Sequence, residues 1–214
     1  MSLRVALVED DAFTRLTLSA ALKTRGLDVV FEASNATDAV RLVEQHTIDV
    51  ALLDLHLGAG PTGIDVAQAM RRREPSVGIV FLTSFDDPRL LSANLPPLPG
   101  GAHYLTKNSI ADIDSLAEVI FLAAEGKGKP TAPAPANALG KFSDTQVETL
   151  RLLAQGLSNG EIAKRRFVSE KSIEAAISRM AKILGLAPDS TRNQRVHMAK
   201  VYFRALGMSP VDQD

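Results

Sequence analysis

Near the middle of the first half of the chain stands the stretch Ile48-Asp49-Val50-Ala51-Leu52-Leu53-Asp54-Leu55-His56-Leu57-Gly58. Its apolar run has the length of a strand and is typical of a strand buried on both faces of a parallel sheet. The carboxylate of Asp54 ends this run, and a loop rich in glycine, proline and threonine follows over residues 58–63. Open α/β sheets bind ligands at the carboxyl ends of their strands. Asp54 is therefore a candidate functional residue, although a lone aspartate at this place could also simply cap the loop.

Strands and helices are expected to alternate around this stretch through the first 125 residues. Apolar runs predict strands at residues 3–8, 29–33, 48–53, 77–82 and 102–105. Helical periodicity lies between them and after the last one, at residues 13–26, 36–45, 64–73 and 110–124. This order predicts a doubly wound, five-stranded parallel sheet.

The connection between the fourth and fifth strands fits this pattern poorly. Asp86-Asp87-Pro88 predicts the start of a helix, because an acidic cap is followed by a proline in the first turn. Leu95-Pro96-Pro97-Leu98-Pro99-Gly100-Gly101 cannot continue that helix, since proline removes a backbone donor and clashes with the preceding turn. We expect a fourth helix of about two turns at most, followed by an extended loop.

The second half of the chain is predicted to be helical and separate from the first. Residues 126–139 are rich in proline, alanine and glycine, which predicts an extended, semi-stiff linker. Capping boxes of Ser143 with Gln146 and of Ser158 with Glu161 predict two helix starts. The expected domains are residues 1–125, the linker 126–139, an all-α four-helix domain at 140–208 and a tail at 209–214.

Within the second domain, the order of short helices predicts a helix-turn-helix. The helix after Ser158 extends to about Arg166, a third helix runs from Ser169 to near Gly185, and a fourth spans roughly residues 192–206. Two short helices joined by a tight turn and flanked by others are typical of this DNA-binding motif.

Charge divides the chain in the same way. Residues 1–125 carry 10 basic and 17 acidic side chains, a net charge of −7, whereas residues 140–208 carry 12 basic and 6 acidic ones, a net charge of +6. We expect only the second half to meet a polyanion. The chain has no cysteine, which excludes a disulfide framework and a thiol nucleophile. Without an apolar run of membrane-spanning length or a signal peptide, the expected location is cytoplasmic, with no membrane partner.

Polar residues follow four of the predicted strands. Glu9 and Asp10 end the first strand, Asp54 the third, Thr83 the fourth and Lys107 the fifth. Three carboxylates that converge on one crevice raise each other's pKa unless a cation lies among them. Oxygen ligands on short side chains suit Mg²⁺, and a lysine with a hydroxyl opposite them could hold the oxygens of a phosphoryl group on Asp54.

The motifs at these strand ends resemble the markers of two-component receiver domains. They are Val8-Glu9-Asp10-Asp11, Leu52-Leu53-Asp54, Leu82-Thr83-Ser84 and Tyr104-Leu105-Thr106-Lys107. The resemblance covers residues 1–125 and implies the CheY/flavodoxin-like fold of receivers. It also implies that a sensor histidine kinase phosphorylates Asp54.

The same resemblance implies a role for each marker residue. Glu9, Asp10, Asp54 and the main-chain carbonyl of His56 would hold Mg²⁺. The residues expected to bind the phosphoryl oxygens or to switch with them are Thr83, Ser84, Tyr104 and Lys107, with Tyr104 swinging inward together with Thr83. The prolines after Leu95 stand against a regular switch surface, because the fourth helix normally belongs to it.

Residues 142–186 resemble the LuxR-type helix-turn-helix. The matching stretches are Leu152-Leu153-Ala154-Gln155-Gly156-Leu157-Ser158-Asn159-Gly160-Glu161-Ile162-Ala163, Val168-Ser169-Glu170-Lys171-Ser172-Ile173-Glu174 and Met180-Ala181-Lys182-Ile183-Leu184-Gly185-Leu186. A receiver joined to this module is the layout of the NarL/FixJ subfamily of response regulators. The resemblance implies a transcription regulator that binds double-stranded DNA.

The third helix of this module is expected to read DNA. Ile173, Ala176, Ile177, Met180 and Leu184 lie at helical spacing and should form its core side. The residues left for the groove are Lys171, Ser172, Glu174, Ala175, Ser178, Arg179 and Lys182. By resemblance, Glu174, Ala175 and Ser178 take the base-reading positions, while the family often carries histidine where this chain has Ala176. Phosphate contacts are expected from Lys164, Arg165, Arg166, Lys171, Arg179 and Arg192.

These expectations describe a phosphorylation-controlled switch and not a metabolic enzyme. An apolar stripe on the last helix, formed by Val196, Ala199, Tyr202, Phe203 and Leu206, suggests a homodimer on DNA. Three alternatives stay open: a regulator that binds DNA without phosphorylation, a signalling module whose output is protein binding, and a Mg²⁺-dependent phosphatase. The last one lacks a cap domain and a second aspartate two residues after Asp54.

Overall fold

The computed structural model describes residues 2–92, 95–126, 138–186 and 193–208. The described residues form two compact units. The sheet unit contains residues 2–84 and 96–126, and the helical unit contains residues 85–92, 95, 138–186 and 193–208. Most of the predicted linker, the predicted tail and Arg192 lie outside the described residues.

The sheet unit is built on five parallel strands, as predicted. They are β1 (Arg4–Val8), β2 (Asp28–Ala33), β3 (Val50–Leu53), β4 (Gly78–Thr83) and β5 (His103–Thr106). Their order is β2-β1-β3-β4-β5, so the chain winds outward in both directions from β1. Strand β3, which carries the stretch quoted first, is buried at every position and pairs with β1 and β4. Its side chains therefore form the centre of the sheet's core.

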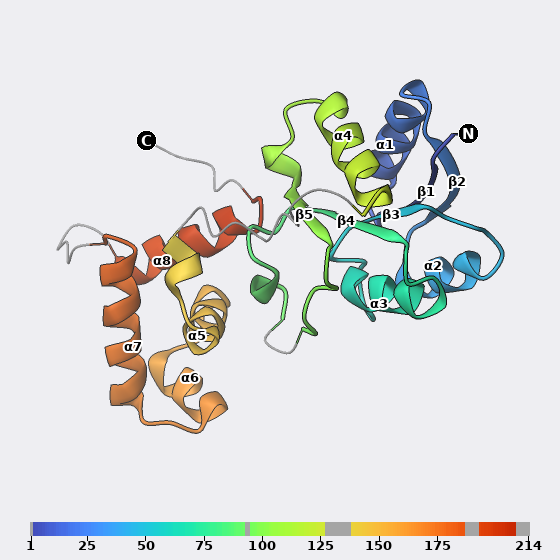
Figure 1. Cartoon of the computed structure of the whole chain (residues 1–214). Helices are drawn as coiled ribbons and strands as arrows, with labels where there is room; N and C mark the ends of the chain where they lie inside the picture. The colour runs from blue at the N-terminus through green and yellow to red at the C-terminus, as the bar shows by residue number, and fades with distance from the viewer. Residues whose placement is uncertain (1, 93–94, 127–137, 187–192, 209–214) are drawn as a thin grey trace. The chain divides into compact units, whose positions relative to one another are not determined.

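Helices cover both faces of this sheet (Figure 1). Helices α1 (Ala12–Thr24) and α4 (Ile113–Ala124) lie over one face, and α2 (Ala36–Val43) and α3 (Gly63–Arg73) lie over the other. Each begins at a side chain that accepts a backbone N–H of its first turn: Asp11, Asn35, Thr62 and Asp112. Such caps satisfy donors that the helix itself leaves unpaired.

The connection between β4 and β5 departs from the regular alternation. The predicted fourth helix is reduced to the 3₁₀ turn η1 (Pro88–Leu90), capped by Asp87, and a second 3₁₀ turn, η2 (Lys107–Ser109), follows β5. The prolines after Leu95 prevent any helix from continuing past that residue. Residues 85–92 and 95 were expected in the first domain, whereas their contacts group them with the helical unit.

The helical unit contains four α-helices among its described residues, in agreement with the predicted all-α architecture. After the 3₁₀ turn η3 (Ala138–Lys141) come α5 (Asp144–Ala154), α6 (Asn159–Arg166), α7 (Glu170–Ile183) and α8 (Gln194–Ala205). The capping box of Ser143 and Gln146 is complete. At α6, Ser158 accepts the N–H of Glu161, but the Glu161 carboxylate accepts from Lys164 instead of returning to the cap. Only the first half of that predicted box is present.

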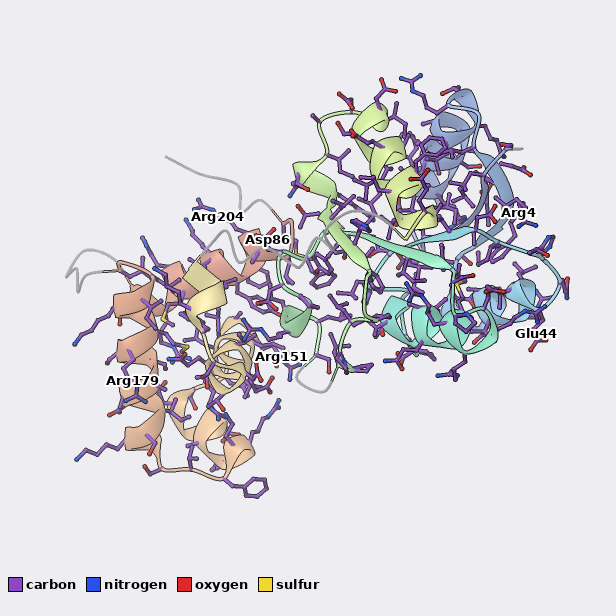
Figure 2. The ribbon with its side chains drawn as sticks, in the orientation of Figure 1. Arg4, Glu44, Asp86, Arg151, Arg179 and Arg204 are labelled. Atoms are coloured by element: carbon purple, nitrogen blue, oxygen red, sulfur yellow. The ribbon has the colours of Figure 1, made fainter. Side chains whose placement is uncertain are left out.

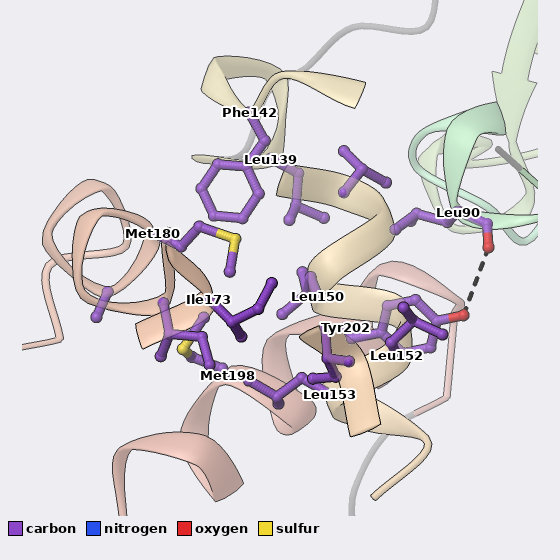
Figure 3. Packing of buried hydrophobic residues seen from close by; sticks show 14 of the residues in the cluster. Leu90, Leu139, Phe142, Leu150, Leu152, Leu153, Ile173, Met180, Met198 and Tyr202 are labelled. Atoms are coloured by element: carbon purple, nitrogen blue, oxygen red, sulfur yellow. Dashed lines mark hydrogen bonds between the residues drawn. The ribbon is translucent and has the colours of Figure 1, made fainter. Parts of the chain in front are cut away.

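One hydrophobic cluster holds the helical unit together (Figure 3). Leu150, Met180 and Met198, from three different helices, are fully buried in it. Leu90 of η1 belongs to the same cluster and is only 1% exposed. None of the helices in the described parts of the chain is long and apolar enough to cross a membrane.

Candidate functional site

The parallel strands bring the predicted acidic residues to one edge of the sheet. Glu9 follows β1 and Asp54 follows β3, and the N–H of Asp54 donates to the carbonyl of Val8, the last residue of β1, at 2.8 Å. Lys107 follows β5, which pairs with the end of β4 through Thr83 and Thr106. The polar ends of four strands that are far apart in the sequence therefore converge, because the strands share one direction.

A lysine lies between two carboxylates at this edge. The ammonium nitrogen of Lys107 donates to Asp54 Oδ2 at 2.7 Å and to Glu9 Oε1 at 2.9 Å. Glu9 is 2% exposed and Asp54 is 7% exposed, so both carboxylates are largely withdrawn from water. Charge-assisted hydrogen bonds of this length compensate for part of their lost hydration.

Burial and charge shift the pKa values of this cluster. Burial raises the pKa of Glu9 to about 7, and the nearby Asp54 adds to the rise, while the hydrogen bond from Lys107 opposes it. For Lys107, burial alone would lower the pKa, but the hydrogen bonds and charges of Asp54 and Glu9 outweigh it, so its pKa is raised. Lys107 therefore stays positively charged at neutral pH, whereas Glu9 gains or loses its proton near neutral pH.

The three predicted metal ligands form an acidic cluster. Each of Glu9, Asp10 and Asp54 offers a carboxylate oxygen, and these oxygens lie within 4.8 Å of one another. The residue set fits a hard cation, because its ligands are all oxygen atoms and the single positive charge of Lys107 does not balance three carboxylates. The main-chain N–H of His56 donates to Asp54 Oδ1 at 3.3 Å, which orients the second oxygen of this carboxylate.

The predicted switch residues lie next to the acidic cluster along the sheet. Thr83 ends β4 and is fully buried, and Ser84 after it is half-buried. Tyr104 of β5 is 3% exposed, and its ring lies 6.3 Å from the ring of Phe81, centroid to centroid. The aromatic ring therefore already lies inside the sheet unit in this structure.

Two further residues shape the site and were not predicted from the sequence. Arg15 of α1 donates to the backbone carbonyl of Glu9 at 2.6 Å and to that of Asp10 at 3.3 Å, which holds the loop after β1. A β-carbon built on Gly63 would lie 2.0 Å from the backbone oxygen of Asp54. Only glycine fits there, and its position at the end of the glycine-rich loop was the one available signal.

The predicted DNA-reading helix has a buried and an exposed side. Ile173, Ala176, Ile177 and Met180 of α7 are buried as predicted, while Leu184 just after it is half-buried. The residues predicted to face the groove are all exposed: Lys171, Ser172, Glu174, Ala175, Ser178, Arg179 and Lys182. Figure 2 shows Arg179 on α7 among these side chains. Because Ala176 is buried, this position offers no contact to a groove in this chain.

The predicted cations of α6 are in different environments. Arg165 is exposed, whereas Lys164 donates to Glu161 at 2.9 Å and Arg166 donates to the buried hydroxyl of Thr149 in α5. The Arg166 guanidinium thus links two helices of the unit in addition to any contact with a ligand. Arg192, the remaining predicted phosphate contact, lies outside the described residues.

A doubly wound sheet with this acidic edge, joined to a helix-turn-helix unit, defines a class of signalling proteins. Residues 5–121 match the family model described as the response regulator receiver domain, which covers more than half of the chain. Residues 141–199 match the family described as bacterial regulatory proteins, luxR family. The chain belongs to the response regulators of the NarL/FixJ subfamily, which join these two domains.

The relatives are similar over most of their length. The chain is 30% identical to the DNA-binding transcriptional activator DevR/DosR of Mycobacterium tuberculosis, over 86% of this chain and 88% of the relative. It is 28% identical to the transcriptional regulatory protein LiaR of Bacillus subtilis, over 86% and 92%. A solved structure of the response regulator RcsB in complex with DNA matches with a TM-score of 0.60 and 22% identity, over 96% of this chain and 100% of that one, which shows a shared fold.

Proposed function

We propose that this protein is a transcription regulator whose DNA binding is controlled by phosphorylation of Asp54. The observation that carries the proposal is the meeting of Glu9, Asp54 and Lys107 at one sheet edge, in a chain that also carries a LuxR-type domain. The phosphoryl donor would be a sensor histidine kinase, and the target is double-stranded DNA. The proposed location is the cytoplasm, where that DNA lies.

Phosphoryl transfer would proceed at the Asp54 carboxylate. One of its oxygens attacks the phosphorus atom while the bond between phosphorus and the donor's imidazole nitrogen breaks. Lys107, now bonded to Asp54 Oδ2, is within reach of the new phosphoryl oxygens and can neutralise part of their charge. The hydroxyls of Thr83 and Ser84 would bind the same group from the end of β4, with Tyr104 moving together with Thr83.

Glu9, Asp10, Asp54 and the main-chain carbonyl of His56 would hold Mg²⁺ at this edge. When bound, the ion would supply positive charge that offsets the three carboxylates and the incoming phosphoryl oxygens. The close approach of the three carboxylate oxygens supports this part of the proposal. Arg15 would keep the loop that bears Glu9 and Asp10 in place through its bonds to their carbonyls.

The exposed side of α7 would enter the major groove. Glu174 can accept from a cytosine amine, Ala175 can contact a thymine methyl, and Ser178 can bond to either kind of base edge. The proposed phosphate contacts are Lys164, Arg165, Arg166, Lys171 and Arg179. Ser172 and Lys182 are also exposed on α7 and are proposed to contact the DNA. Most of the affinity would therefore depend on salt concentration.

A homodimer on DNA is part of the proposal. Val196 and Phe203 of α8 are 52% and 37% exposed, and they stand seven residues apart on one side of the helix. Tyr202, which belongs to the same predicted stripe, is buried inside the helical unit and packs on the module. The pair of exposed apolar residues supports contact between two copies of α8.

The first test is intact mass after incubation with Mg²⁺ and a small phosphodonor, such as phosphoramidate. We expect one phosphoryl adduct on the wild type and none on Asp54→Asn. Binding to a duplex selected from a random pool is then compared with and without the adduct, over a series of salt concentrations.

Each outcome separates the proposal from its alternatives. An adduct with stronger, salt-dependent DNA binding supports the phosphorylation switch. DNA binding without any adduct would point to a regulator that works without phosphorylation, and an adduct with no DNA binding at any salt concentration would point to a protein partner as the output.

A further inference from the structure

The helical unit contains a segment from the middle of the receiver sequence. Residues 85–92 and 95, between β4 and β5, group with α5 to α8 and not with the sheet. Leu90 is 1% exposed in the cluster that also contains Leu139, Phe142 and Tyr202 (Figure 3). Phe85 packs against the same cluster. Because burial of a large apolar side chain stabilises the structure that surrounds it, Leu90 ties this segment to the core of the helical unit.

Arg89 is the polar centre of this attachment. Its Nε and Nη2 donate to the Asp87 carboxylate at 3.0 and 2.6 Å, and its Nη1 donates to the carbonyl of Phe142 at 2.8 Å and to Asp144 Oδ1 at 3.0 Å. Nη2 also reaches the carbonyl of Leu139 at 3.3 Å. All five N–H donors of the guanidinium therefore have acceptors. No other side chain offers five such donors.

The segment also bonds to the last helix. The hydroxyl of Tyr202 donates to the carbonyl of Leu90 at 3.4 Å, and the N–H of Asp86 donates to the carbonyl of Ala205 at 2.9 Å. Figure 2 shows Asp86 beside the end of α8 that carries Arg204. The segment is thus attached to both the start of α5 and the end of α8.

The attachment begins two residues after the proposed switch. Thr83 is buried at the end of β4, Ser84 follows, and Phe85 already belongs to the helical unit. Two residues span about 7 Å at most, so they leave little slack between the phosphorylation site and the segment. A shift of Thr83 toward a phosphoryl group would be passed along the backbone to Phe85 and the residues attached to it.

We infer that the helical unit has a docking surface, formed by η3, the start of α5 and the end of α8, whose ligand is the segment 85–92 of the same chain. Through this docked segment, phosphorylation of Asp54 changes the local stability of α5 and α8. Arg89 is the residue that joins the segment to the docking surface. The inference rests on the proposed function and adds the route by which its two halves communicate.

Hydrogen–deuterium exchange on the full chain, before and after phosphorylation with phosphoramidate and Mg²⁺, tests this route. The variants are Arg89→Ala, Arg89→Lys and a control, Arg151→Ala, which removes a local ion pair with Glu148 within α5. In the wild type we expect phosphorylation to change exchange in residues 85–92 and in α5 and α8 by about fivefold or more. In Arg89→Ala the adduct should still form, with the change in α5 and α8 lost.

The control and the lysine variant sharpen the test. Arg151→Ala should keep the phosphorylation-dependent change, and Arg89→Lys should lose most of it, since an ammonium cannot bond to all of these acceptors at once. A merely structural role for Arg89 would speed exchange of the unphosphorylated unit and leave the phosphorylation-dependent change in place.

Three results would overturn the inference. The first is an unchanged response of α5 and α8 in Arg89→Ala, and the second is a wild type that forms the adduct without any change in residues 85–92. The third is a wild type that forms no adduct, which the mass spectrum reveals separately and which would remove the proposed function as well.

Discussion

The acidic edge of the sheet unit and the exposed side of α7 are constructed in opposite ways. At the acidic edge, Glu9 and Asp54 are buried and hydrogen-bonded to Lys107, and their backbone N–H groups donate to the ends of β2 and β1. On α7, Glu174, Ser178 and Arg179 are exposed on the surface of a single helix. The first site depends on the whole fold for its geometry, whereas the second depends only on one helix face. Substitutions should therefore disturb shape and chemistry together at the acidic edge, and binding alone on α7.

The strongest test of the shape dependence at the acidic edge is Gly63→Ala. Its added methyl group would lie 2.0 Å from the backbone oxygen of Asp54, so the loop that carries Asp54 must move. We expect a loss of about 1–3 kcal/mol in the free energy of unfolding, measured by urea denaturation, together with much slower phosphorylation. Gly100→Ala is the matched control, because nothing lies within 4 Å of a β-carbon there. Equal behaviour of the two variants would contradict the dependence on shape.

The burial of Glu9 makes metal binding depend on pH. Because its pKa is about 7, Glu9 carries a proton below that pH in the folded, metal-free protein. Mg²⁺ must displace this proton in order to bind. Mg²⁺ affinity should fall by about tenfold for each pH unit below 7 and level off above it. The free energy of unfolding has the opposite pH dependence. Because folding raises the pKa of Glu9, the metal-free protein should become less stable as the pH rises from about 4.5 to 7.

Calorimetric titration with Mg²⁺ between acidic and mildly basic pH measures this dependence. Two buffers with different heats of ionisation count the proton released on binding. Glu9→Gln should remove both the proton release and the slope. A Glu9→Gln protein that keeps the slope of the wild type would show that another group titrates.

On α7, removal of a side chain should affect DNA binding without affecting the fold. Arg179→Ala should reduce the slope of log affinity against log salt concentration by about 1, if the guanidinium contacts one phosphate. Stability should change by less than about 0.5 kcal/mol, because Arg179 is exposed. Arg41→Ala removes the same charge from the surface of α2 and should leave the salt dependence unchanged. A large loss of stability in Arg179→Ala would break the contrast between the two sites.

The smallest expected effect concerns the turn before α7. Phe167 is 96% exposed and has a φ of 53°, the left-handed region that favours glycine and asparagine. Phe167→Asn should raise the free energy of unfolding by about 0.5 kcal/mol, since asparagine tolerates this conformation. Phe13 is also exposed, at 77%, but lies on the regular backbone of α1, so Phe13→Asn should bring no gain in the free energy of unfolding, measured for both variants by urea denaturation. A gain at both positions would mean that loss of an exposed ring, and not backbone conformation, is the cause.

The acidic edge was predictable because its signals are local. Glu9, Asp54 and Lys107 each stand at the carboxyl end of a predicted strand, and parallel topology then brings these strand ends together without further information. The two sides of α7 were predictable for a similar reason, since helical spacing alone separates Ile173 and Met180 from Glu174 and Ser178. The acidic edge thus follows from the order and direction of the strands, and the two sides of α7 follow from the period of the helix.

The residues that were missed act through contacts between distant parts of the sequence. Leu90 is one apolar residue in an irregular segment, and no periodicity indicates which of two cores it joins. Arg15 has the pattern of a solvent-facing helix residue, yet its guanidinium bonds to backbone carbonyls. The incomplete capping box of α6 is a subtler case, because Glu161 had two possible partners and the structure pairs it with Lys164.

The path of the chain also limits how such a protein can be recombined. Because Leu90 and Arg89 come from a stretch between two strands of the sheet, a cut within the linker does not separate the two units cleanly. A chimaera that joined residues 138–214 to another receiver would lack Leu90 in its core. The acceptors on Leu139, Phe142 and Asp144 would also lack the guanidinium of Arg89. Exchange of output domains by gene fusion would therefore succeed only when the recipient carries a compatible segment between its fourth and fifth strands, so receiver and DNA-binding domain should be inherited as a pair.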